Sequence, residues 1–244
     1  MRVVAHLSDL HFGRVDRAAL EPLRRRLAEL APDLVVVSGD LTQRARARQF
    51  REARAFLDTL PRPQVVVPGN HDVPLYNVFA RFLWPLANYR RAIAEDVEPS
   101  FADDEITVLG LNTARSFVFK GGRVSEAQLA RVEALGRLRG EAVKIVVTHH
   151  PFGALERLAR SGVDVLMAGH AHAASVAGTS ALLVQAGTAT SSRKREEPNS
   201  FNLLRVSRRR VEVEQYALSA GVFERAAAEV FEFGDQGWRR CGPA

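Results

Sequence analysis

The 244-residue sequence has little of several features that restrict a protein's location. Cys241 is its single cysteine, so no intramolecular disulfide can form, and a reducing compartment is favoured. No apolar run is long enough to span a bilayer. The amino terminus enters an expected strand at once, without the basic and apolar regions of a secretory signal. We therefore expect a cytoplasmic protein with no membrane span.

Lysine is scarce as well. Only Lys120, Lys144 and Lys194 occur, so the formal net charge of +6 comes almost entirely from arginine. A basic protein can attract polyanions, but an arginine bias also arises from genome composition. The charge therefore favours a soluble basic surface, and nucleic acid is a less favoured partner.

Helical and strand patterns alternate along the chain, and its 46% hydrophobic content is ample for a core. Apolar residues recur at helical spacing over residues 17–30, 44–59 and 125–139, and strands are expected at 181–185, 201–206 and 211–218. Residues 207–210 fit a hairpin turn. This alternation predicts a layered α/β sandwich forming one domain over residues 1–218, with 219–244 as a C-terminal extension.

Five short apolar runs each end in a polar cluster of metal-ligand residue types. The clusters are Ser8-Asp9-Leu10-His11, Ser38-Gly39-Asp40, Gly69-Asn70-His71-Asp72, Thr148-His149-His150 and Gly169-His170-Ala171-His172. Strands of α/β folds deliver functional residues at their carboxyl ends, along one rim of the sheet. The pattern predicts one polynuclear metal site. His6 lies inside the first strand and is expected to be a structural core residue.

The chemistry of these clusters suits two divalent ions. Asp9 and His11 alternate along an extended chain and can face the same way, and a single carboxylate at Asp40 could bridge two ions. Oxygen and imidazole ligands without thiolate suit manganese, iron or zinc. Two aspartates leave such a centre positive, so it would attract phosphate oxygens and lower the pKa of bound water.

The five clusters resemble the signature blocks of the calcineurin-like metallophosphoesterases over residues 4–172, with no ligand position missing. This resemblance implies a four-layer α-β-β-α sandwich with two mixed sheets and a dinuclear centre, which could be a mixed iron and manganese pair. By position, Asp9, His11, Asp40 and His172 would hold one metal. The other would be held by Asp40, Asn70, His149 and His170.

The resemblance also implies a reaction, namely in-line attack of a metal-bound hydroxide on a phosphoester. His71 would be the catalytic residue that stabilises the transition state or protonates the leaving oxygen. Asp72 either orients His71 or anchors its loop. His150 either contacts substrate or ties down its own loop.

Within the superfamily, the opening residues 6–11 look most similar to bacterial class III cyclic-nucleotide phosphodiesterases, which implies a small phosphodiester substrate. A nucleotide-sugar lipid pyrophosphatase is an alternative, because residues 74–101 could form a lid for a lipid substrate, although they could equally be plain packing. A DNA or RNA nuclease is a further alternative. A non-catalytic metal-binding scaffold is opposed by the intact ligand set. The sequence does not define an oligomeric state.

Overall fold

The computed structural model describes residues 1–116, 122–150, 155–171, 173–178, 180–192 and 197–243. Its central strands are buried on both faces. In β2 (Leu34–Val37), Leu34 and Val36 belong to one hydrophobic core, and Val35 and Val37 to another. Successive strand side chains point to opposite faces, so an unbroken apolar run is the expected sequence of a strand between two cores.

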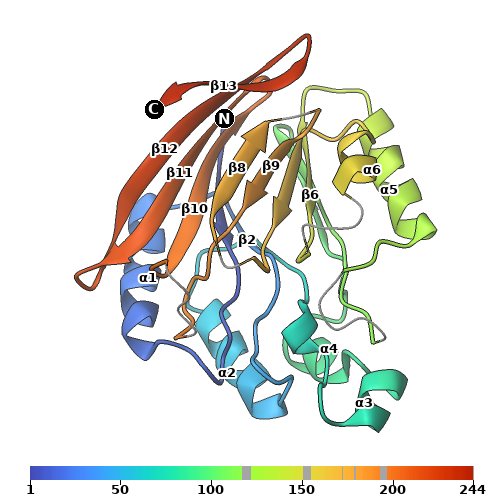
Figure 1. Cartoon of the computed structure of the whole chain (residues 1–244), viewed down its shortest axis with the longest axis vertical. Helices are drawn as coiled ribbons and strands as arrows, with labels where there is room; N and C mark the ends of the chain where they lie inside the picture. The colour runs from blue at the N-terminus through green and yellow to red at the C-terminus, as the bar shows by residue number, and fades with distance from the viewer. Residues whose placement is uncertain (117–121, 151–154, 172, 179, 193–196, 244) are drawn as a thin grey trace.

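Two mixed sheets stack face to face (Figure 1). The seven-stranded sheet has the order β13-β12-β11-β10-β1-β2-β3, and the six-stranded sheet the order β4-β5-β6-β7-β9-β8. The strands of the first are β1 (Arg2–Leu7), β2, β3 (Gln64–Val66), β10 (Ser200–Ser207), β11 (Arg210–Ser219), β12 (Val222–Gly234) and β13 (Gly237–Pro243). Those of the second are β4 (Ser100–Ala102), β5 (Ile106–Gly110), β6 (Val143–Val147), β7 (Val165–Ala168), β8 (Ser175–Gly178) and β9 (Leu182–Gln185).

Helices cover the outer face of each sheet (Figure 1). Helices α1 (Arg17–Leu30), α2 (Ala47–Leu57) and α4 (Ala87–Ala92) pack on the first sheet through side chains such as Leu27, Phe50 and Tyr89. Helices α5 (Glu126–Arg137) and α6 (Leu155–Ala159) pack on the second, where Val132 contributes to a third core. The layers follow the order α-β-β-α, so the expected sandwich is confirmed.

Parallel pairing brings the predicted site loops to common edges. Strands β1, β2 and β3 are parallel neighbours in the first sheet, as are β6 and β7 in the second. The carboxyl ends of parallel neighbours meet at one edge of a sheet. The five polar clusters follow these five strands.

Residues 219–244, expected as an extension, contain β12 and β13. These two strands continue the first sheet, because β12 pairs with β11 along Arg210–Ser219 and β13 pairs with β12. The expected turn at residues 207–210 is present, since Ser207 pairs with Arg210 between β10 and β11. No break in the sheet therefore separates residues 219–243 from the strands before them.

Residues 74–101 divide into two parts. The later part packs on the core through α4, where Tyr89 is buried and its hydroxyl donates to the Val66 carbonyl oxygen (2.8 Å). The earlier part, with the short helix α3 (Val78–Leu83), exposes large apolar side chains, among them Phe79 and Trp84. The packing interpretation therefore holds for the later part, and the lid interpretation of the earlier part stays a prediction. None of the described helices combines the length and apolar character needed to cross a membrane.

Candidate metal centre

Four of the predicted ligands hold their backbone in the left-handed region. The φ angles are 55° at Asp9, 50° at His11, 54° at Asp40 and 71° at His170. Residues other than glycine rarely adopt this conformation, which costs on the order of 1–3 kcal/mol each. These residues follow strands that are packed between two hydrophobic cores. Their strained turns direct the four side chains toward one point. Backbone strain concentrated in this way is typical of a functional site.

The first group of donors consists of Asp9, His11 and Asp40, all buried. His11 Nε2 lies 3.3 Å from Asp9 Oδ1 and 3.7 Å from Asp40 Oδ2. Asp9 is fixed through its other oxygen, Oδ2, which accepts the Ser8 hydroxyl (2.6 Å) and the His170 backbone N–H (3.1 Å). Two carboxylates and an imidazole from two neighbouring strands thus face one point.

The second group gathers around His149. Its Nε2 lies 3.1 Å from Asn70 Oδ1, 3.3 Å from His170 Nδ1 and 3.4 Å from Asp40 Oδ1. Its Nδ1–H donates to the Ser38 carbonyl oxygen (2.7 Å), which fixes the ring orientation. A second hydrogen bond of this kind is typical of histidines that bind a metal through their other nitrogen. His172, predicted as a ligand, lies outside the described residues.

Asp40 joins the two groups, since its Oδ2 faces His11 and its Oδ1 faces His149. Oδ1 also accepts the backbone N–H of His71 (2.8 Å). Oδ2 is buried and has no hydrogen-bond partner among the described residues. The Asp40 carboxylate therefore presents one oxygen to each donor group.

Glycines let the backbone approach these side chains closely. A Cβ atom at Gly39 would lie 2.7 Å from His149 Nδ1, and one at Gly69 would collide with Asp40 Oδ1. At Gly169 a Cβ would collide with the Ser8 hydroxyl that holds Asp9. Each position precedes a predicted ligand and cannot hold a side chain without displacing another.

The loop after β3 places His71 beside the first group without joining it. The rings of His71 and His11 meet edge to face at 5.0 Å. The Nδ1–H of His71 donates to the Gln43 carbonyl oxygen (3.0 Å), and its side chain is partly exposed. His71 therefore borders the donor groups on the solvent side.

Asp72 is buried and anchors two loops. Its carboxylate accepts the backbone N–H groups of Gly69 (2.9 Å), Leu41 (3.1 Å) and Thr42 (2.9 Å) and the Thr42 hydroxyl (3.0 Å). Of the two roles considered from the sequence, these bonds support the anchoring one. Burial and the charge of Asp40 raise the pKa of Asp72 to about 6 despite them.

His150 lies inside the site. Its Nδ1 contacts the Thr113 hydroxyl (2.9 Å), and its ring centre is 4.8 Å from those of both His149 and His170. Its Nε2 is buried and has no hydrogen-bond partner among the described residues. Burial, together with the charges of His149 and His170, lowers the pKa of His150 to about 2, so this ring is neutral.

The electrostatics of the buried centre favour a cation. Burial opposes ionisation of Asp9, but its contact with His11 and the charge of His149 outweigh burial and lower the pKa of Asp9 to about 2. Burial likewise opposes protonation of His149, yet the charges of Asp40 and Asp9 raise its pKa to about 9. Without a metal, the aspartates draw a proton onto His149.

The donors present fit a pair of divalent ions. Acceptor oxygens of Asp40 and Asn70 converge with the Nε2 of His149, and a positive charge among them satisfies all three. The buried Oδ2 of Asp40, which has no hydrogen-bond partner among the described residues, also needs a positive charge beside it. Oxygen and nitrogen donors, with no thiolate in the described centre, suit manganese, iron or zinc.

Sequence reasoning missed the residues that hold the donors in place. The Ser8 hydroxyl holds Asp9, the Ser38 carbonyl holds His149, and Gln43 holds His71. Ser8 and Ser38 stand directly after their strands, so strand-end serines were an available signal. The Gln43 contact is made by a backbone carbonyl 28 residues away and leaves no side-chain signature.

Comparison with known proteins agrees with this geometry. The family model for calcineurin-like phosphoesterases matches residues 2–174. The fold and the paired donor groups define a metal-dependent phosphoester hydrolase framework. The chain belongs to the calcineurin-like phosphoesterase family, as its signature blocks indicated.

Several curated relatives carry phosphodiesterase names. The chain is 29% identical over 165 residues to glycerophosphodiester phosphodiesterase GpdQ of Enterobacter lignolyticus, covering 61% of this chain and 56% of that protein. It is 21% identical over 201 residues to a Synechococcus protein named "Probable cyclic nucleotide phosphodiesterase", covering 72% of this chain and 75% of that protein. The chain thus spans just over half of the GpdQ protein.

A solved structure supports the fold. A dimetal phosphatase from Danio rerio superposes with a TM-score of 0.67 at 15% identity, covering 96% of this chain and 99% of that one. At this identity the likeness concerns the fold alone.

Proposed function

We propose that this protein is a dinuclear-metal phosphodiesterase that hydrolyses small phosphodiesters. One metal would be held by Asp9, His11, Asp40 and His172, with His172 assigned by the family resemblance alone. The other would be held by Asp40, Asn70, His149 and His170. Manganese, iron and zinc suit these donors, including a mixed iron and manganese pair.

The position of Asp40 carries the proposal. Its two oxygens lie 3.7 Å from His11 Nε2 and 3.4 Å from His149 Nε2, one toward each donor group. A carboxylate shared in this way would hold two cations close together, and two such ions would act on the attacking and leaving oxygens of one phosphoryl group.

Two divalent ions, when bound, would supply Lewis acidity and a water of lowered pKa. The chain itself supplies a proton donor. The Nδ1–H of His71 donates to the Gln43 carbonyl oxygen, which orients the ring, and we assign the proton transfer to its other ring nitrogen, Nε2. Protonated there, His71 would stabilise charge on the phosphoryl group and deliver a proton to the departing oxygen. Asp40 holds the His71 backbone in place for this role.

Cyclic nucleotides and glycerophosphodiesters are the substrates that the names of the relatives favour. A nucleotide-sugar lipid pyrophosphatase and a nuclease are the enzymatic alternatives, and a metal-binding scaffold is the non-enzymatic one. A cytoplasmic location, favoured by the single cysteine, belongs to the same proposal.

The test is a hydrolysis panel with protein loaded with manganese, iron or zinc. It comprises bis-p-nitrophenyl phosphate, p-nitrophenyl phosphate, cyclic AMP, a glycerophosphodiester, a linear dinucleotide, single-stranded DNA and a nucleotide-sugar lipid. We expect diesters to be cleaved faster than the monoester, and EDTA to abolish both activities. Faster monoester cleavage, or two bound metals without turnover on any substrate, would refute the phosphodiesterase proposal.

A further inference from the structure

Large apolar side chains are exposed together in one short stretch. Of the eleven exposed large hydrophobic side chains in the described part of the chain, seven lie within residues 75–84. They are Leu75, Tyr76, Val78, Phe79, Phe82, Leu83 and Trp84. The exposed fractions reach 79% at Phe79 and 65% at Trp84. An apolar surface of this kind on a soluble protein marks a binding face.

Positive charge accompanies these side chains. Residues 74–94 contain no acidic residue; of their three arginines, Arg81 is buried, Arg90 pairs with Glu95 and Arg91 is exposed. The Arg44 guanidinium lies over the Tyr76 ring, 5.2 Å from its centre. Arg91 is exposed and makes no ion pair with another described residue. We call residues 75–84 with Arg44 and Arg91 the aromatic–basic face.

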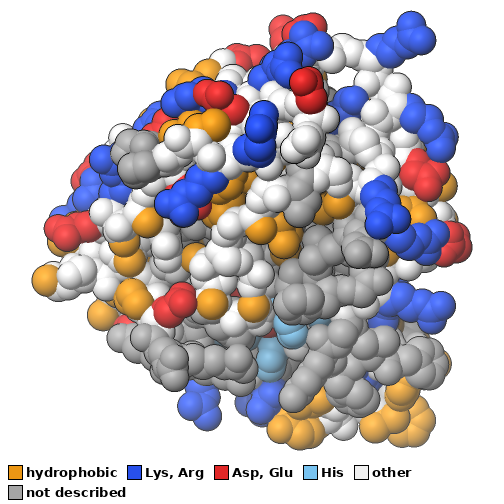
Figure 2. All heavy atoms as spheres, turned by 45° about the horizontal axis from the view of Figure 1, so that its top comes forward, with side chains coloured by type: hydrophobic (Ala, Val, Ile, Leu, Met, Phe, Trp, Pro, Cys, Tyr) orange, Lys and Arg blue, Asp and Glu red, His pale blue; other side chains and the backbone are white. Residues whose placement is uncertain are grey.

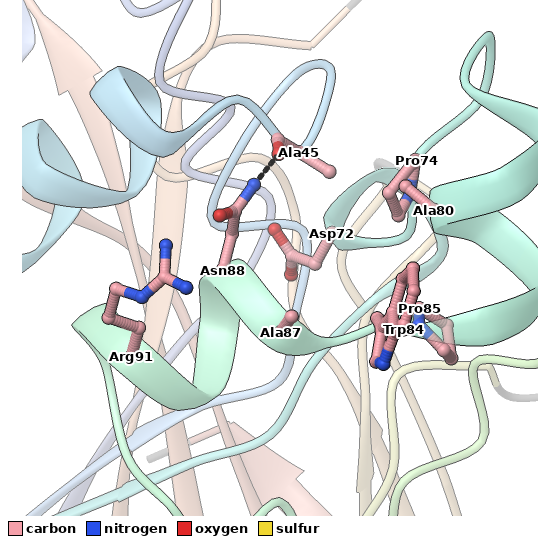
Figure 3. A pocket seen from close by; sticks show the side chains of 9 residues that line it. All are labelled: Ala45, Asp72, Pro74, Ala80, Trp84, Pro85, Ala87, Asn88 and Arg91. Atoms are coloured by element: carbon pink, nitrogen blue, oxygen red, sulfur yellow. Dashed lines mark hydrogen bonds between the residues drawn. The ribbon is translucent and has the colours of Figure 1, made fainter.

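The aromatic–basic face adjoins the metal centre. A pocket of about 380 Å³ opens between the Ala45 loop and helices α3 and α4, with Trp84 toward one end and Arg91 toward the other (Figure 3). Asp72, the anchor of the loop that carries Asn70 and His71, lines this pocket. In the space-filling view, hydrophobic side chains gather at the lower edge of the molecule, near histidines and basic side chains (Figure 2).

We infer that the aromatic–basic face docks on the surface of a bilayer that contains anionic phospholipids. Aromatic rings with apolar bodies sit at the lipid–water boundary, and nearby arginines attract anionic headgroups. The metal centre would then open toward the headgroup layer. Attachment would be peripheral and reversible, since α3 is a single short helix.

Charge argues against a second copy of the chain as the occupant. A twofold interface sets the same surface patch against itself. Here that would set Arg44 and Arg91 against the same arginines of the other copy, and residues 75–84 contain no acidic side chain to pair with them. An anionic lipid surface offers an apolar layer for the exposed aromatic and aliphatic side chains and negative headgroups for the arginines of the aromatic–basic face.

The two tryptophans provide a built-in probe. Trp84 is 65% exposed and Trp238 is 2% exposed, so an environmental change at the aromatic–basic face reports through Trp84 alone. With vesicles of phosphatidylglycerol and phosphatidylcholine, we expect a blue shift of the emission and co-sedimentation of the full chain. Vesicles of phosphatidylcholine alone, or high salt, should weaken binding. Absence of both signals with anionic vesicles would overturn the inference.

Matched variants locate the contact. Phe79→Ser combined with Leu83→Ser should weaken partitioning at least about tenfold, as expected when inserted apolar area is lost. Leu138→Ser combined with Val222→Ser removes exposed apolar side chains elsewhere and should change nothing. Arg44→Gln with Arg91→Gln should lower binding to anionic vesicles only. Thermal unfolding checks that each variant is folded.

Two results would contradict this assignment. One is equal vesicle binding by the Phe79→Ser, Leu83→Ser variant and the unaltered chain. The other is a dimer, seen by light scattering without lipid, that the same variant dissociates, because a second copy would then cover the face. The readout is binding, so it stands or falls separately from the phosphodiesterase proposal.

Discussion

The backbone N–H of His71 donates to Asp40 Oδ1 at 2.8 Å, so the residue proposed to bridge the metals also positions the residue proposed for proton transfer. The two come from loops 31 residues apart in the chain. Asp72 reinforces this link by tying the same two loops together at Leu41 and Thr42. Changes at Asp40 should therefore affect both binding and chemistry, whereas changes at His71 should affect chemistry alone.

Replacing Asp40 by Ala should empty at least one metal position. The carboxylate faces both donor groups, and its loss leaves His11 and His149 without their shared acidic partner. Because even indirect changes around a metal cost about 10–100-fold in affinity or activity, turnover should fall by at least about a hundredfold. Metals per chain are measured by plasma emission spectrometry. The exposed Asp104→Ala serves as control, and two fully occupied metals in the Asp40 variant would disprove the bridging role.

The His71→Ala variant should keep its metals and lose turnover. In the unaltered chain the Nδ1–H of His71 donates to the Gln43 carbonyl oxygen, and we assign no metal to His71. Loss of a positioned acid typically lowers kcat by about 10²- to 10⁴-fold. Metal content and kcat are measured on the same preparation. A metal-depleted variant would reassign His71 as a ligand.

At Gly69, substitution by Ala should disturb the centre through crowding alone. The φ angle of Gly69 is −106°, which any residue can adopt, but an added Cβ would strike Asp40. We expect lower metal occupancy and lower thermal stability. Gly140→Ala is the counterpart, since its Cβ meets nothing within 4 Å but its φ is 145°. That change should cost only about 1 kcal/mol of stability and no metal. Equal effects of the two substitutions would contradict the crowding argument.

His6 should make stability depend on pH. It is buried against the Ser38 hydroxyl (2.9 Å), and burial lowers its pKa from 6.5 to about 3. Below pH 6.5 His6 binds a proton in the unfolded chain but not in the folded chain. The free energy of unfolding is therefore retained above pH 6.5 and decreases as the pH falls toward 3. Between pH 7 and 5.5 the loss should be about 1 kcal/mol.

The His6→Asn variant isolates this effect, because it lacks the titrating group while sharing all the others. Urea unfolding of both proteins at several pH values should show the unaltered chain losing stability faster on acidification. Parallel stability profiles would mean that His6 titrates normally and is not enclosed as described.

The layered α/β fold and the convergence of the polar clusters follow from patterns in the sequence itself, whereas the four layers and the division of the donors between two metals came from the family resemblance. The run Leu34 to Val37 is apolar at every position, as a strand between two cores requires. Asp9 follows such a run by two residues and Asp40 by three, and parallel pairing of β1 with β2 brings both to the same edge of the sheet.

Other features depend on contacts that no local pattern encodes. The sequence could not decide between the two roles of Asp72, because two of its partners, Leu41 and Thr42, lie about 30 residues away. In β12 the alternation is obscured by charged residues, and its pairing with β11 shifts register between Gln215 and Tyr216 of β11. The exposure of Phe79 and Trp84 cannot be told from sequence, since an amphipathic helix packed on a core has the same composition.

The long-range origin of the donors has a consequence for biosynthesis. Asp9 and Asp40 precede His149 and His170 by more than a hundred residues of the chain. On the ribosome, the early aspartates would emerge with no imidazole partner but His11 and His71. The centre is therefore completed only after these histidines have been made, and a product stopped before residue 149 would carry only part of it.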